Sequence, residues 1–190
     1  TPEPIQAVLP ERLRHQFDHD FARQPDMMKL FSELFGPYPL AGGYTVVVTD
    51  DPLDIPLEAQ GISIFGSNHC DGSGDSERLI AHELAHQWFG NSVTARQWRD
   101  IWLHEGFACY AEWLWSEHSG GPGADEMARR HHAELRHKPQ DLVLTDPGAR
   151  RMFDDRVYKR GALTVEALRH LLGTDLFGSM LRAWVRETQG

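Results

Sequence analysis

The sequence predicts an α+β, mainly helical fold with a short N-terminal sheet portion. Apolar residues recur at helical spacing through most of the chain, whereas residues 44–49 form a β-branched run and residues 61–65 read as a second strand. With 190 residues the chain suits one domain that is large enough to bury a sizeable core. We therefore expect residues 1–190 to fold as one unit.

The expected elements follow in chain order. Residues 10–35 are expected to be helical, and Pro25 is expected to break or restart that helix. The two strands come next, and a polar, glycine-rich connection over residues 66–74 follows them. Asp75 or Ser76 is placed to cap the next helix, which should stop at Gly90, and Asp100 is placed to cap the one after it. Further helices are expected over residues 101–117, 124–137, 155–172 and 175–187, with a cleft-bordering loop at 138–150.

One helix carries a pattern typical of metal chemistry. In His82-Glu83-Leu84-Ala85-His86 the two histidines are four residues apart, so they share a helix face and can bind one metal ion. Glu83 lies about 100° round the helix, where it can serve as a general base without binding the metal. The helix is apolar nearly all round, and buried imidazoles and carboxylates are costly unless paired or bound to metal. The pattern therefore predicts one Zn²⁺ per chain.

A catalytic zinc ion commonly has three protein ligands and one open position. The best candidate for the third ligand is Glu105, in the segment Trp102-Leu103-His104-Glu105-Gly106-Phe107-Ala108. His15 and His19 also have the four-residue spacing, but Gln16 stands in the place of the base and the neighbours are charged. We expect no metal at that pair, nor at His69 with Cys70, and we expect solvated side chains for His131, His132 and His137.

Two further segments accompany these motifs. Val157-Tyr158-Lys159-Arg160-Gly161-Ala162-Leu163 and Phe35-Gly36-Pro37-Tyr38-Pro39 are similar to the V-Y-x-K-G-A-L and F-G-x-Y-P segments of the M1 family of gluzincin aminopeptidases, relatives of leukotriene A4 hydrolase. That family's zinc motif resembles His82-Glu83-x-x-His86 followed, after residues 87–104, by Glu105. The resemblance runs from about residue 10 to the end of the chain.

The resemblance implies a thermolysin-like zincin catalytic domain and a zinc-dependent aminopeptidase acting on a peptide or aminoacyl substrate. It implies that Tyr158 stabilises the oxyanion of the transition state, although an ordinary tyrosine at a helix start would fit the spacing alone. It also implies a β-rich domain before this one and a helical domain after it, so residues 1–190 are expected to be one catalytic domain of a larger protein.

Two departures from the family pattern bear on the site. The exopeptidase motif G-x-M-E-N should lie between Tyr44 and the zinc helix, where this chain has Pro56-Leu57-Glu58-Ala59-Gln60-Gly61. Glu58 is kept and is expected to bind the free amino group of the substrate. His104 stands where the family usually has asparagine, and it either tunes the metal site or packs structurally.

Composition narrows the functional classes. A formal net charge of −9 argues against a nucleic-acid partner, and no apolar run approaches the roughly 20 residues of a membrane span. Two cysteines demand no disulfide framework, which favours a reducing, cytoplasmic location. Two alternatives remain open from the residues: an epoxide or bifunctional hydrolase on the same zinc site, and a catalytically silent peptide-binding module whose zinc holds the fold.

Overall fold

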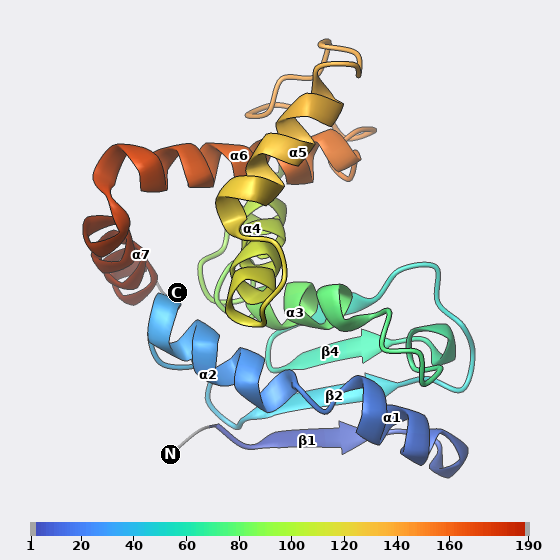
Figure 1. Cartoon of the computed structure of the whole chain (residues 1–190). Coiled ribbons are helices and arrows are strands. Elements are labelled where there is room, and N and C mark those ends of the chain that lie inside the picture. The colour runs from blue at the N-terminus through green and yellow to red at the C-terminus, as the bar shows by residue number, and fades with distance from the viewer. Residues whose placement is uncertain (1–2, 189–190) are drawn as a thin grey trace.

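The computed structural model describes residues 3–188 and confirms the mainly helical α+β fold (Figure 1). The strands form a small sheet, α3 runs along it, and α4 leads from α3 towards α5 and α6 (Figure 1). None of the helices among residues 3–188 is both long and apolar enough to cross a membrane. The elements are β1 (Ile5–Val8), α1 (Arg14–Asp20), α2 (Gln24–Phe35), β2 (Tyr44–Val48), β3 (Leu57–Ala59), β4 (Ile62–Phe65), α3 (Glu77–Ala85), α4 (Trp102–His118), α5 (Ala124–Leu135), α6 (Asp155–Leu172) and α7 (Thr174–Thr188).

The sheet has the strand order β1-β2-β4-β3. The first three strands are parallel, and β3 runs antiparallel to β4 with Glu58 opposite Ser63. Alternate residues of β2 are buried, which is the pattern of a strand with one face on the core. Strand β1 was not predicted from the sequence, because four residues after a proline carry little strand signal.

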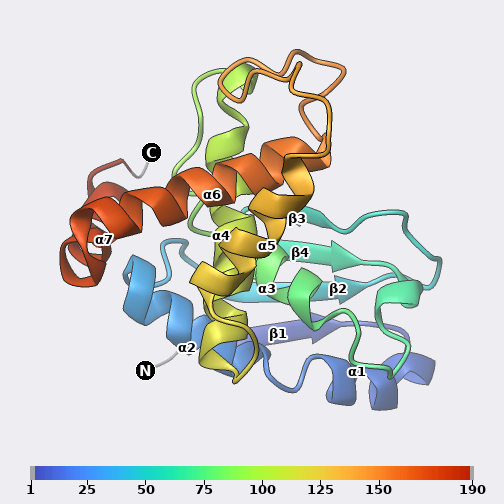
Figure 2. The same ribbon diagram turned by 45° about the horizontal axis from the view of Figure 1, so that its top comes forward.

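Strand β3 forms a hairpin with β4 and lies at the open edge of the sheet, on the side that faces α6 (Figure 2). Gly61 in the connecting turn has a φ of +76°, a backbone conformation that favours glycine. The expected strand at 61–65 is confirmed as β4, and the extended approach from Glu58 is itself a short strand. The main chain of β3 is therefore available for pairing on its outer side.

The N-terminal helical region is divided in two. A turn at residues 21–23 separates α1 from α2, and Pro25 stands in the first turn of α2. A proline is tolerated there because the first N–H groups of a helix have no partner within the helix. The expectation that Pro25 restarts the helix is confirmed.

Helix α3, which carries His82, differs from its predicted limits. It ends at Ala85 rather than Gly90, because the chain after His86 folds into turns in which Asn91 donates to the His86 carbonyl and Val93 to that of Trp88. The predicted side-chain caps are also wrong. Ser76 precedes α3 without a capping hydrogen bond from its side chain, and Asp100 belongs to a 3₁₀ turn, so that Ile101 precedes α4.

Helices α4 and α6 cross with their main chains in contact. A Cβ atom built on Gly161 of α6 would lie 2.6 Å from the Gly106 Cα of α4, and one built on Gly106 would lie 2.7 Å from the Gly161 Cα. Side chains larger than hydrogen are therefore excluded at both positions. The crossing places the first turn of α6 beside Glu105.

Candidate metal centre and its cleft

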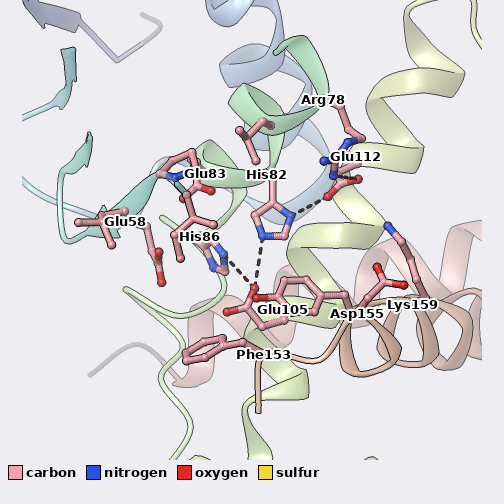
Figure 3. A pocket seen from close by; sticks show the side chains of 15 residues that line it. Glu58, Arg78, His82, Glu83, His86, Glu105, Glu112, Phe153, Asp155 and Lys159 are labelled. Atoms are coloured by element: carbon pink, nitrogen blue, oxygen red, sulfur yellow. Dashed lines mark hydrogen bonds and ion pairs between the residues drawn. The ribbon is translucent and has the colours of Figure 1, made fainter. Parts of the chain in front are cut away.

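The three predicted metal ligands meet in the structure. His82 comes from the second half of α3, and His86 directly follows the last residue of that helix. Glu105 comes from the first turn of α4, which packs against α3 (Figure 3). Glu105 Oε2 lies 3.3 Å from His82 Nε2 and 3.5 Å from His86 Nε2. All three residues are buried.

The opposite ring nitrogens fix the orientation of both histidines. His82 Nδ1 lies 2.7 Å from Glu112 Oε1, and His86 Nδ1 donates to the Phe89 carbonyl oxygen over 3.0 Å. A proton held on Nδ1 by an acceptor leaves the Nε2 lone pair for a metal. Both Nε2 atoms point towards Glu105.

This donor set fits zinc. Zinc–ligand bonds of about 2.0–2.1 Å at tetrahedral angles place neighbouring ligand atoms about 3.3 Å apart. The measured separations of 3.3 and 3.5 Å agree with that spacing. Two imidazoles and one carboxylate also match the ligand types of catalytic zinc sites.

The same three side chains are strongly coupled by charge. Burial alone would lower the pKa of His82, but Glu105 and Glu112 raise it to about 10. Burial likewise opposes protonation of His86, and Glu105 raises its pKa to about 8. Burial would raise the pKa of Glu105, yet the two histidines hold it well below its usual range. The pocket thus stabilises positive charge next to Glu105, and a bound divalent cation would supply such a charge.

Glu83 lies beside this centre without belonging to the ligand trio. It is buried, and its Oε2 has no hydrogen-bond partner among residues 3–188. Burial raises the pKa of its carboxyl group. A buried carboxylate without a partner is costly, so its presence indicates a role other than holding the fold.

Tyr158 and Glu58 complete the predicted set. Tyr158 lies in the first turn of α6, and its ring stacks on that of His82 with 5.9 Å between centroids. Burial and the charge of Glu105 raise the pKa of the phenol, so it remains protonated at neutral pH. Glu58 is exposed on β3, and ligand atoms of Glu58, Glu83 and His86 lie within 4.8 Å of one another. All six predicted residues line one cleft of about 510 Å³.

Glu112 was not among the site residues predicted from the sequence. This carboxylate is buried, accepts from His82 Nδ1, and pairs with Arg78 Nη1 at 2.9 Å. Glu105 and Glu112 are seven residues apart, so two helix turns place them on the same face of α4. The seven-residue spacing could therefore have indicated Glu112 as a second carboxylate near the histidines.

We expect Glu112→Gln to weaken Zn²⁺ binding about 10- to 100-fold, because the carboxylate that orients His82 is lost. The measurement is competition with a chromophoric zinc chelator. Glu126→Gln is the matched control, since Glu126 is exposed on α5 and pairs with Arg130. Equal zinc affinity in both variants would mean that Glu112 does not support the metal ligand.

Other predicted details have mixed outcomes. His104 Nε2 accepts a hydrogen bond from the Ala95 N–H over 2.8 Å, which is a structural contact with the loop after α3. The prediction that His131 is solvated is wrong, since its ring stacks on Trp113 at 5.4 Å. The loop at 138–150 does not itself line the cleft; Phe153 and Asp155, which follow it, do.

The segment before α6 is held by Arg156. This side chain donates to the Pro139 carbonyl oxygen over 2.8 Å and to the carboxylates of Asp141 and Asp154 over 2.7 and 2.8 Å. Asp154 also accepts from the Arg156 backbone N–H and so caps α6. These contacts fix the helix start that carries Tyr158.

Comparisons with known proteins agree with this site. The sequence matches the profile of the peptidase family M1 domain over residues 20–190. Aminopeptidase Ey of Gallus gallus is 33% identical over 145 residues, which cover 66% of this chain and 14% of that protein. Aminopeptidase N of Mus musculus is 34% identical over 127 residues, which cover 58% of this chain and 13% of that protein. The chain thus matches a small part of each curated relative.

Solved structures give the same result. An M1 zinc metallopeptidase mutant from Deinococcus radiodurans, bound to a Tyr-Ser-Ala substrate, is 37% identical with a TM-score of 0.77, over 88% of this chain and 37% of that one. Native yeast LTA4 hydrolase is 19% identical with a TM-score of 0.82, over 97% of this chain and 32% of that one. At this low identity, the similarity to yeast LTA4 hydrolase shows only that the two chains share a fold.

Proposed function

The chain belongs to peptidase family M1, and we propose that it is the catalytic domain of a zinc-dependent aminopeptidase. The reaction is hydrolysis of the N-terminal bond of a peptide or aminoacyl amide. The observation that carries this proposal is the single cleft that joins a zinc-type donor trio to Glu83, Tyr158 and Glu58. A zinc ion that only held the fold would need none of these last three residues.

His82, His86 and Glu105 would hold the zinc ion. When bound, zinc polarises the carbonyl group that is attacked and lowers the pKa of water towards about 7. Glu105 supplies the negative charge of the donor set, and Glu112 keeps the His82 ring in the required orientation. The remaining chemistry belongs to side chains of this chain.

Glu83 is proposed to move the proton. Its carboxylate accepts a proton from the attacking water and later gives it to the leaving amine. The raised pKa brings the carboxyl group closer to the pH at which it must both accept and donate. The Oε2 atom has no hydrogen-bond partner in the described part of the chain and is available for this exchange.

Tyr158 is proposed to stabilise the negative oxygen that forms when the carbonyl carbon becomes tetrahedral. Its hydroxyl is a donor at neutral pH, because a phenol ionises near pH 10 and burial raises the pKa of Tyr158 further. The stack on His82 and the contact between α4 and α6 hold the donor in place before the reaction begins. A donor that is already positioned loses little free energy to reorganisation.

Glu58 is proposed to bind the α-ammonium group of the substrate. Strand β3 can pair with an extended peptide at the open sheet edge, so that the first substrate residue lies beside Glu58. An ammonium group anchored there fixes the register, and one residue is removed at a time.

The experiment that tests this function compares an aminoacyl reporter amide with its N-acetylated twin, using the zinc-loaded chain. Cleavage of the free amine alone supports an aminopeptidase. Equal cleavage of both would contradict the exopeptidase assignment, and cleavage of neither would count against a catalytic domain that acts on its own.

We expect Glu58→Ala to lower kcat/KM for the free amine at least about 30-fold, which corresponds to about 2 kcal/mol for a lost ion-pair partner. Asp54→Ala is the matched control, because Asp54 is an exposed carboxylate in the segment before β3 and lies outside the cleft lining. Unchanged rates in Glu58→Ala would remove Glu58 from the site.

A further inference from the structure

The cleft extends on both sides of the donor trio. Glu58 lies on one side, next to Glu83 and His86, and Arg78 lies on the other side, beyond His82 (Figure 3). A substrate whose amino group is at Glu58 and whose first carbonyl group is at the donor trio must extend towards Arg78. The residues after the cleaved bond therefore pass this arginine.

Arg78 is positioned to meet that part of the substrate. It precedes His82 by four residues, which is about one helix turn or 6 Å along α3. It also lines a second cavity of about 420 Å³ adjoining the first, together with Glu112. Arg78 thus stands where the cleft leads out of the catalytic centre.

The guanidinium group of Arg78 retains donors for a ligand. Its side chain is 59% exposed, and its one ion pair among residues 3–188 is with Glu112, whose side chain is 3% exposed. Glu112 uses its other oxygen for His82. A guanidinium group has five N–H donors in a planar fork that matches a carboxylate.

The other charged residues at this end of the cleft are less suited to bind a substrate carboxylate. Lys159 is partly buried, and its Nζ lies 3.3 Å from Cys109 Sγ. Asp155 is exposed at this end of the cleft but pairs with Lys138 at 3.1 Å. Arg78 is therefore the cation best placed to receive a carboxylate from the substrate.

We propose that Arg78 binds a carboxylate on the leaving part of the substrate, so that peptides with Asp or Glu as their second residue are preferred. The inference rests on the proposed function, because that function places the amino group at Glu58. An acidic side chain and the free carboxylate of a dipeptide share this chemistry. The side chain is the source proposed here, because the adjoining second cavity leaves room for the chain to continue beyond Arg78.

The test compares kcat/KM for three substrates with leucine as the first residue: Leu-Glu-amide, Leu-Gln-amide and Leu-Gln with a free carboxylate. Glutamate and glutamine differ mainly in charge, so the Glu/Gln ratio of the two amides reports recognition of the side-chain carboxylate. We expect a ratio of about five in the parent, as for an exposed ion pair, and about one in Arg78→Gln. Arg99→Gln is the control, since Arg99 is exposed and outside the cleft lining.

Each outcome bears on one proposal. A parent ratio of one, or an unchanged ratio in Arg78→Gln, would overturn the role of Arg78. A preference for the free dipeptide over its amide that disappears in Arg78→Gln would assign the contact to the terminal carboxylate and overturn the acidic second residue. Failure of the parent to cleave any of the three substrates would count against the aminopeptidase function itself. Because the readout is a ratio, a change in zinc content that scales all rates equally does not affect it.

Discussion

Glu83→Gln is expected to lower kcat by about 10²- to 10⁴-fold, the usual contribution of a general base. Glutamine keeps the size of the side chain and removes its ability to accept the proton. It also removes a buried carboxylate whose Oε2 lacks a partner within residues 3–188, so the melting temperature should not fall. Steady-state kinetics, zinc content by elemental analysis and a thermal melt are the three measurements.

Glu126→Gln on the surface of α5 serves as the control for a charge change of the same kind. Full zinc content with lost turnover would separate Glu83 from the metal ligands. Retained turnover in Glu83→Gln would exclude it as the base, and loss of zinc would place it among the ligands instead.

Tyr158→Phe is expected to lower kcat by about 10²- to 10³-fold with little change in KM, as for removal of one donor to a developing oxyanion. The phenylalanine ring can keep the stack on His82, so the fold and the zinc affinity should be retained. An inhibitor with a tetrahedral phosphorus or boron centre should lose affinity in step with kcat, whereas a substrate-like inhibitor should not.

Tyr38→Phe provides a matched loss of a hydroxyl group, because the Tyr38 hydroxyl donates to the Gly43 carbonyl oxygen away from the cleft lining. If Tyr158→Phe raised KM and left kcat unchanged, Tyr158 would bind substrate without stabilising the transition state.

The grouping of the candidate site residues was largely predictable from the sequence because the metal-binding pattern depends on local spacing. Two histidines four residues apart need only a helix to meet, and α6 has the expected bounds of 155–172. The seven-residue spacing of Glu105 and Glu112 could have been used, whereas the contribution of Arg78 depends on how α3 packs against α4, which spacing within one helix does not determine. The end of α3 was missed because the chain after His86 folds into turns, and the Trp88 indole N–H donates to the Gly36 carbonyl oxygen of a distant segment.

The contact between Gly106 and Gly161 also links two parts of the candidate site. Glu105 immediately precedes one glycine, and Tyr158 stands nearly one turn before the other, so the close contact of α4 with α6 sets the positions of these two side chains relative to each other. Strand β3 has β4 as its one strand neighbour in the described part of the chain. Glu58 is therefore carried by a different element from Glu105 and Tyr158, so the group proposed to receive a new N-terminus is attached to the fold separately from the groups proposed for the chemistry.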